Sequence, residues 1–397
     1  MDASTLLALR DPAGIPFYPV VFQALYILTW ALHAAFVFLS LGAMGLSIYG
    51  TFKQKTDENW KILTPHLIQT GKISVSILIV LGVAPLLFTQ VIYDPNWYVA
   101  NTLSGMWIFS FIYILVLGYI MYYWYYFANK KTVGGGKLIG IISFSILIVC
   151  GVLMHSFAVT SIMPNEWMNM YAPNGVIDNS GWTFNIKTVR LIFLLSLSIP
   201  IVGIFLQNYS RFLSTREDFN KDFIEYTAKI GTRIAIVGLL ISAVMFVAWM
   251  VQLGYLIHPV SISIIAGVLI LLYMVYQNNN SYITTLVLLL VALLISGLRE
   301  VIRYDIMSKL GYNVYDYPVN LEIPSLVMFL LTFLILGGFG VAWLLTMAWK
   351  VGKTQGVFDG SKDVAVTKLG NYTLGIMVIW MVVYFAWGMT ILFNNIL

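Results

Sequence analysis

The stretch Leu28–Phe38, LTWALHAAFVF, decides the fold class, because it lies inside an apolar run from Tyr18 to Tyr49. A transmembrane helix needs roughly 20 predominantly apolar residues, and this run exceeds that length. One titratable ring, His33, stands within it. An ionisable side chain is costly in a membrane span and is a sign of function. The stretch therefore predicts a membrane helix that carries a functional group.

The composition of the whole chain has the same character. Of its 397 residues, 60% are hydrophobic and 10% are charged, and the mean hydropathy is +0.86. Soluble domains carry about a quarter charged residues. This composition predicts an all-α, polytopic transmembrane helix bundle in a lipid membrane. The net charge of +5 does not indicate a nucleic-acid partner, because the basic residues flank the spans.

Ten runs are candidate spans, and several are longer than a bilayer requires, which predicts tilted helices or helices that extend past the lipid. The ten are Tyr18–Tyr49, Leu63–Tyr93, Leu103–Phe127, Leu138–Ser161, Thr188–Gln207, Ile230–Ile257, Pro259–Tyr276, Tyr282–Tyr304, Pro324–Trp349 and Tyr372–Leu397. We expect a single integral membrane domain. Its parts are an outer arm over residues 1–17, a helical core over 18–304, an outer loop over 305–322 and two C-terminal spans over 323–397.

The basic residues predict the orientation, because cytoplasmic loops carry an excess of Lys and Arg. With the N-terminus outside, sixteen of the 22 basic residues fall on the inner side. They are Lys53, Lys55, Lys61, Lys72, Lys130, Lys131, Lys137, Arg211, Arg216, Lys221, Lys229, Arg233, Lys350, Lys353, Lys362 and Lys368. Both termini are then outside, as are the main loops 94–102, 163–187 and 305–322. The first 17 residues show no cleavable signal peptide.

The motifs and the cysteine count exclude several kinds of chemistry. The single cysteine, Cys150, excludes intrachain disulfides, cysteine zinc sites, iron–sulfur clusters and a CxxCH haem site. No Walker A motif, Rossmann fingerprint or nucleophile elbow occurs. Chemistry therefore depends on the four histidines and on the charged residues in the spans.

His33 and His155 are predicted to lie at similar depth. At 1.5 Å per residue, His33 is about 6 Å and His155 about 9 Å to the outer side of the membrane midplane. Neutral imidazole is a standard axial ligand of haem, so the two rings are candidate ligands of one haem iron. Two unrelated histidines that each make a hydrogen bond between helices are the alternative.

A charged cluster at the outer end of the eighth span is the second candidate. In Gly297–Asp305, GLREVIRYD, the residues Arg299 and Arg303 are one turn apart and share a helix face, with Glu300 beside them. Paired arginines suit haem propionates, and they suit an interfacial salt-bridge cluster equally well. Arg190, near the outer end of the fifth span, joins the candidates, with snorkelling to the interface as its alternative.

The other two histidines are weaker candidates. His66 follows Thr64-Pro65 near an inner helix start and is interpreted as interfacial, and His258 precedes Pro259 in an outer turn. A quinone head-group needs protonatable neighbours. Glu300 with Arg303 would supply them on the outer side, or His66 with Lys72 on the inner side.

Four segments resemble subunit I of the cytochrome bd quinol oxidases. FQALYILTWALHAAFVFLSLG (22–42) is similar to the family's first helix, with His33 at a haem-ligand histidine, and LGVAPLLFTQVIYDPNW (81–97) is similar to the second. SFSILIVCGVLM (143–154) resembles the fourth helix, where His155 falls on a glutamine. EVIR (300–303) resembles a Glu-x-Gly-Arg motif. About the first 300 residues follow the family order.

The departures from that family limit what the resemblance implies. The third span, Leu103–Phe127, lacks the acidic pair of the oxygen-reducing site, and the second-helix glutamate is Gln90. Arg190 stands where the family has a low-spin haem histidine, and Ile265 falls near the methionine opposite. The long quinol-binding loop is reduced to QLGYLIHP (252–259). The resemblance thus implies a bd-like scaffold and a haem at His33, without oxygen reduction.

We therefore expect a membrane subunit of a respiratory electron-transfer complex in a prokaryotic inner membrane. It would bind haem b and exchange electrons between quinone or quinol and a periplasmic c-type cytochrome, alongside other complex subunits. A haemless structural subunit is the first alternative. A transporter or channel is the second, although no inverted repeat is apparent. A true quinol oxidase is less favoured, because the third span has no carboxylate.

Overall fold

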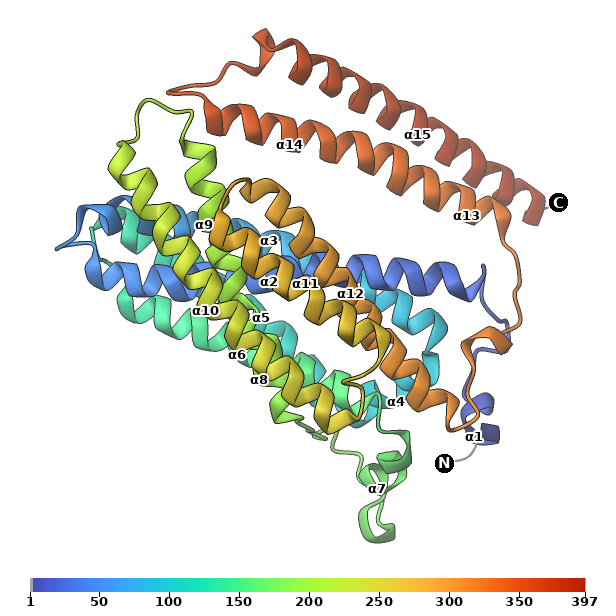
Figure 1. Ribbon diagram of the computed structural model, residues 1–397. Helices are drawn as coiled ribbons and strands as arrows, with labels where there is room; N and C mark the ends of the chain where they lie inside the picture. The colour runs from blue at the N-terminus through green and yellow to red at the C-terminus, as the bar shows by residue number, and fades with distance from the viewer. Residues whose placement is uncertain (1–2, 397) are drawn as a thin grey trace. The chain divides into compact units, whose positions relative to one another are not determined.

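The computed structural model describes residues 3–396, and these form helices joined by short loops (Figure 1). Ten of the helical stretches are long and apolar enough to cross a membrane, so the chain is an all-α, multi-pass membrane protein, as predicted. They occupy Pro19–Lys53, Glu58–Ile92, Gly105–Lys131, Lys137–Thr160, Thr188–Leu213, Lys221–Leu253, Pro259–Gln277, Ser281–Ser308, Ile323–Lys353 and Val364–Asn394. Which side of the membrane holds the N-terminus stays a prediction. Below, 'outer' names only the end of the bundle at which the first span begins, near Pro19, and 'inner' names the opposite end, near Lys53.

Contacts between Cα atoms divide the chain into two units. The first comprises residues 1–211 and 222–318, and the second comprises residues 212–221 and 319–397. The second unit contains the two C-terminal spans, and the prediction of a single integral membrane domain stays a prediction.

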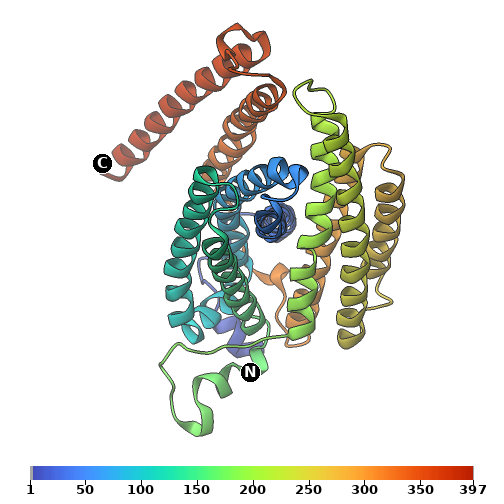
Figure 2. The ribbon, with the colours of Figure 1, turned by 90° about the vertical axis from the view of Figure 1, so that its left-hand side faces the viewer.

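Two groups of helices build the first unit. One group is α2 (Pro19–Lys53), α3 (Glu58–Ile92), α5 (Gly105–Lys131) and α6 (Lys137–Thr160). The other is α8 (Thr188–Ser196), α9 (Ser198–Leu213), α10 (Lys221–Leu253), α11 (Pro259–Gln277) and α12 (Ser281–Ser308). Each group has its own apolar core, and Figure 2 shows α2 end-on, between the other helices of its own group and the second group. Helix α2 also packs directly on α12.

Small residues let these helices approach closely. A Cβ atom at Gly42 of α2 would collide with the carbonyl oxygen of Ser198, and one at Gly203 of α9 would collide with the backbone of Ala235 in α10. Membrane helices pack by such close contact, because lipid provides no hydrophobic drive for helices to associate. The fifth span is divided into α8 and α9 at Leu197, and Pro200 follows in the first turn of α9.

A layer of short segments closes the outer end of the first unit. It contains α1 (Ala3–Ala8), α4 (Asp94–Leu103), α7 (Trp167–Tyr171) and the loop around Tyr312. Residues 94–102 were expected to be a loop, and this prediction was wrong, because they form α4. Pro95 lies in its first turn, where a missing N–H costs no hydrogen bond, and Asp94 favours a helix N-terminus.

In the second unit, α13 (Ile323–Leu330) continues through a π-helical stretch, Leu331–Gly337, into α14 (Gly338–Lys353), and α15 (Val364–Ile396) packs against α14. The Trp380 indole N–H donates to Thr332 Oγ1 at 2.8 Å. None of the residues in the most apolar window of either span is buried.

Candidate functional site

One face of α2 carries the residues that meet the charged end of α12. Gln23, Tyr26, Trp30 and His33 follow each other at spacings of three, four and three residues, which keeps them on one side of a helix. The Arg299 guanidinium carbon lies 3.8 Å from the centre of the Trp30 ring. The sequence interpretation singled out only His33 in this row. Tyr26 and Trp30 lie at helical spacing from His33, and this spacing is the signal that could have identified them from the sequence.

The predicted pair Glu300 and Arg303 comes together as a buried ion pair, with 3.2 Å between Oε2 and Nη1. Glu300 Oε1 also accepts hydrogen bonds from Gln23 Nε2 at 2.9 Å and from the Tyr93 hydroxyl at 2.6 Å. Arg303 Nη2 donates to the Tyr26 hydroxyl at 3.0 Å. These contacts join α2, α12 and the junction after α3, so both charges have partners.

Tyr93 remains a hydrogen-bond donor in this network. Burial, reinforced by the Glu300 carboxylate, raises the pKa of the Tyr93 hydroxyl well above its usual value. The hydroxyl therefore stays protonated at physiological pH and donates to Glu300. Tyr315 extends the network to the outer loop by donating to Gln23 Oε1 at 2.6 Å.

Arg190 and Arg299 differ from Arg303, because neither makes an ion pair with any residue that the structure describes. Arg190 Nε and Arg299 Nε and Nη1 are buried without a hydrogen-bond partner. The Arg190 guanidinium carbon lies 6.0 Å from the centre of the Trp249 ring, and that of Arg299 lies 3.8 Å from the centre of the Trp30 ring. These contacts with ring faces do not satisfy the unpaired N–H groups. A buried charge without a counter-ion is strongly unfavourable. This part of the protein therefore has an excess of positive charge and of donors, as an anion-binding site requires.

His33 is held in a single tautomer by α3. Its Nδ1 lies 2.9 Å from the carbonyl oxygen of Leu78, so Nδ1 carries the proton, and the Nε2 lone pair is left free. A Cβ atom at Gly82 would lie 2.9 Å from His33 Cε1, so a glycine is needed to seat the ring. Metal-binding histidines commonly donate their second nitrogen to a backbone carbonyl in this way. The surroundings of His33 fit a haem ligand.

His155 is held differently. Its Nε2 accepts a hydrogen bond from the Lys187 backbone N–H at 3.3 Å, and its Nδ1 is buried without a partner. The lone pair on His155 Nε2 therefore accepts this hydrogen bond and is not left free, unlike that on His33 Nε2. Lys187 directly precedes α8, so His155 fixes the start of the helix that carries Arg190. This geometry favours a positioning role, and the prediction that His155 ligates iron stays a prediction.

The structure brings the outer candidates together only in part. Arg299 is close enough to both His33 and His155 to interact with them electrostatically, and Arg190 is close enough to His155. Among the residues that the structure describes, no group of three or more His, Cys, Asp or Glu side chains forms a metal site. A single histidine with neighbouring arginines suits a haem better than a bare metal ion.

The other two histidines lie away from this cluster. His258 caps α11, because its Nδ1 accepts from the Val260 N–H at 3.3 Å, which agrees with its interpretation as a turn residue. The His66 ring lies 5.5 Å from the Tyr209 ring. Lys72 Nζ lies 3.8 Å from the centre of the Tyr126 ring. The inner pair His66 and Lys72 thus contacts tyrosines.

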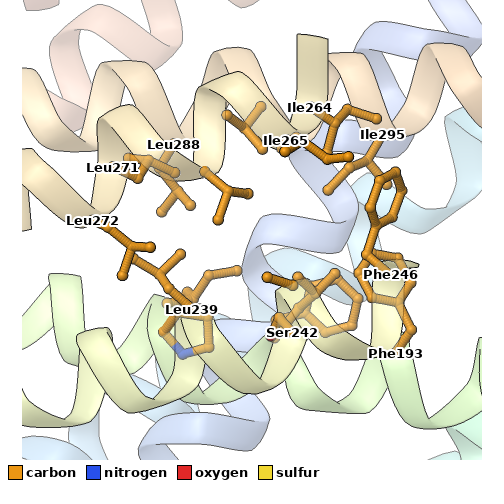
Figure 3. Close-up of a pocket in the computed structure, with 18 of the residues that line it drawn as sticks. Phe193, Leu239, Ser242, Phe246, Ile264, Ile265, Leu271, Leu272, Leu288 and Ile295 are labelled. Carbon is orange, nitrogen blue, oxygen red and sulfur yellow. The ribbon is translucent and has the colours of Figure 1, made fainter. Parts of the chain in front are cut away.

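A cavity of about 190 Å³ lies between α2 and the second helix group. Figure 3 shows its walls, with Leu239, Ser242 and Phe246 of α10 facing Ile265 and Leu272 of α11. Ile265 falls near the methionine ligand in the bd resemblance. No His, Cys, Met or Tyr lines the cavity, so its donor set does not fit a low-spin haem.

The chain matches no protein-family model, no curated protein and no solved structure. The residues and their geometry are therefore the grounds on which a function can be argued.

Proposed function

We propose that the chain is the membrane subunit of a respiratory electron-transfer complex in a prokaryotic cytoplasmic membrane. It binds a b-type haem through His33 and passes electrons between the quinone pool and a periplasmic c-type cytochrome. The observation that carries the proposal is the orientation of His33. Its Nδ1–H is bound to the Leu78 carbonyl, which leaves Nε2 available for iron.

The neighbouring arginines support the same cofactor. Haem carries two propionate carboxylates, and arginine is suited to planar carboxylates. Arg299 and Arg190 have buried N–H groups without partners, and propionates would satisfy them. Arg303 is already paired with Glu300, so its role is to hold α12 against α2. When bound, the haem supplies one-electron redox chemistry.

The surrounding residues orient the ring and control its charge. Gly82 leaves space for the imidazole, and Leu78 fixes the tautomer. Trp30 positions the Arg299 guanidinium by stacking against it. The excess of positive charge favours the reduced form of a bound redox group, because an added electron lowers the electrostatic energy.

The test is a reduced-minus-oxidised visible spectrum of the purified protein, compared with a His33→Leu variant. We expect a b-type Soret and α band that His33→Leu abolishes. The matched control is His258→Asn, which keeps a cap for α11 and lies away from the site. Wild-type protein without haem in a pyridine haemochrome assay would exclude the proposal, as would bands that survive His33→Leu unchanged.

A haemless structural subunit is the second candidate. It is favoured by the hydrogen bonds that Glu300 and His155 already make to neighbouring segments. His155→Gln separates the roles of His155, because a glutamine oxygen can still accept from the Lys187 N–H. We expect this variant to keep the haem bands. Loss of the bands on that change would instead identify His155 as an iron ligand.

A further inference from the structure

Lys72 of α3 is a cation that no acidic side chain in the described part of the chain neutralises. Residues 3–396 contain no group that forms an ion pair or a hydrogen bond with its Nζ atom. The ammonium lies instead over two rings of α5, 3.8 Å from the centre of the Tyr126 ring and 5.4 Å from that of Tyr123. Ring faces attract a cation, but its three N–H donors keep their capacity for oxygen acceptors.

The position of Lys72 along α3 is that of a lipid head-group. Residues 73–92 carry no charged side chain, and Asp94 follows just beyond them. At 1.5 Å per residue this run is about 30 Å long, which is the thickness of the hydrocarbon core of a bilayer. Lys72 directly precedes the run, so its ammonium is at the inner boundary of the hydrocarbon, where lipid phosphates lie.

Hydroxyl groups of α5 surround the ammonium at the same level. The segment 119–127, YIMYYWYYF, is rich in tyrosine, which is typical of a membrane–water interface. The Ser76 and Tyr119 hydroxyls lie 2.9 Å apart, and Tyr119 donates to the Tyr123 hydroxyl at 3.2 Å. The Tyr126 hydroxyl forms no hydrogen bond with any residue that the structure describes. The α3–α5 contact thus presents an ammonium beside phenol hydroxyls.

The same side of the two helices continues into the bilayer as an apolar surface. Val80 lies two turns from Lys72 on α3, and Val116 and Ile112 lie one and two turns further into the membrane than Tyr119 on α5. These three side chains are 73%, 52% and 56% exposed. Acyl chains attached to a phosphate at Lys72 can therefore lie along them without meeting a polar group.

The charges of α3 and α5 favour a head-group with a net negative charge. Helix α5 contains no acidic residue, and the only one in α3, Glu58, is exposed and paired with Lys61 at the far inner end. A zwitterionic head-group would bring an ammonium of its own beside Lys72, with no carboxylate there to compensate it. Basic residues between helices at this depth suit anionic lipids.

We propose that Lys72, Tyr123 and Tyr126 bind the phosphate of an anionic phospholipid at the inner end of the bundle, with its acyl chains along α3 and α5. The ligand differs from the quinone head-group that the sequence suggested for Lys72 together with His66. The site uses no residue of the proposed haem site, so its test does not depend on the haem.

Native mass spectrometry of the whole protein released from dodecyl maltoside tests this site. The two probes are phosphatidylglycerol and phosphatidylethanolamine with identical palmitoyl and oleoyl chains, so that only the head-group differs. We expect the wild type to prefer phosphatidylglycerol, and Lys72→Gln to weaken its binding about fivefold while leaving phosphatidylethanolamine unchanged. The matched control is Lys61→Gln, which removes the same charge from α3 at an exposed position and should keep the preference.

A second variant isolates the hydroxyl. Tyr126→Phe keeps the ring under the ammonium and should weaken phosphatidylglycerol about threefold. The proposal is overturned if the wild type binds both lipids equally, if neither Lys72→Gln nor Tyr126→Phe changes the preference, or if Lys61→Gln lowers it as much as Lys72→Gln. It is also overturned if an equal concentration of inorganic phosphate displaces the lipid, because the site would then recognise free phosphate.

Discussion

Along α2, the inner half buries neutral polar groups, whereas the outer half faces buried charges. At the inner end, the Thr51 and Tyr125 hydroxyls lie 2.6 Å apart, and the Asn129 amide donates to Gln54 Oε1 at 2.8 Å. Gln54 Oε1 also accepts from the Gly134 N–H at 3.1 Å. These contacts hold α2 against the segments around α5 without any charge.

The outer half has more donors than the chain can satisfy. Glu300 pairs with Arg303, but Arg190 and Arg299 keep buried N–H groups without partners. Buried polar groups normally have partners, and an exception calls for an explanation. The inner half is therefore held to its neighbours by neutral hydrogen bonds, whereas the outer half has unpaired cationic donors, which the proposed haem propionates would satisfy. Three experiments test this difference between the two halves.

The largest expected effect is that of Glu300→Ala. It leaves Arg303 buried without its carboxylate, and removing one partner of a buried ion pair costs about 3–5 kcal/mol. Thermal unfolding in detergent, followed by circular dichroism, should show a clearly lower Tm. The control is Glu58→Ala, whose ion pair with Lys61 is exposed and should contribute at most about 1 kcal/mol. Equal changes in Tm for both variants would show that the buried Glu300–Arg303 pair contributes no more to stability than an exposed ion pair.

Two glycine substitutions compare the halves directly. Gly82→Ala places a Cβ 2.9 Å from His33 Cε1, and Gly71→Ala places one against the Tyr122 hydroxyl. Overpacking of this kind costs about 1–3 kcal/mol, so both variants should unfold at a lower temperature. We expect only Gly82→Ala to shift or weaken the haem bands in a reduced-minus-oxidised spectrum. A spectral change in Gly71→Ala, or none in Gly82→Ala, would argue against haem at His33.

The smallest effect concerns Asp94 in the outer layer. Burial raises the pKa of its carboxyl group, which accepts hydrogen bonds from the Tyr317 hydroxyl and the Asp11 N–H. A raised folded-state pKa means that the folded protein binds the proton more tightly than the unfolded chain. This contribution to stability is therefore complete below the unfolded pKa and is lost as pH rises through the folded value.

We accordingly expect the Tm of the wild type to decline modestly as pH rises from about 4 towards neutrality. Asp94→Asn keeps an acceptor oxygen but does not titrate, so its Tm should decline less over the same range. Parallel Tm profiles for the two proteins would show that Asp94 does not contribute to the pH dependence.

The sequence predicted the spans well, because each apolar run is a property of the chain itself. Each of the ten predicted runs corresponds to a helix, although the ends differ. The run Ile230–Ile257, for example, passes the helix end at Leu253, and the last residue of the run Tyr372–Leu397 lies outside the described residues. Helix α3, for example, begins at Glu58, where Asp57 caps it by accepting from the Asn59 N–H. Helix α4 was missed because a short helix outside the membrane has no apolar run to mark it.

The candidate site was predicted less completely. Residue type and depth were enough to select His33, Arg299 and Arg303 and to expect Glu300 beside them. The acceptor for His33, the Leu78 carbonyl, has no side-chain signature at all. The use of His155 Nε2 by the Lys187 N–H also depends on a backbone group that only folding brings near.

The class of protein, the number of spans and the histidine within the first span could therefore be predicted from the sequence, because hydropathy and helix length depend on neighbouring residues alone. The tertiary structure decided which polar atoms are satisfied. It paired Arg303 with Glu300, left Arg190 and Arg299 with unpaired donors, and formed an apolar cavity from five spans. Hydrogen bonds and cavities depend on which helix faces meet, and residues far apart in the chain determine those contacts.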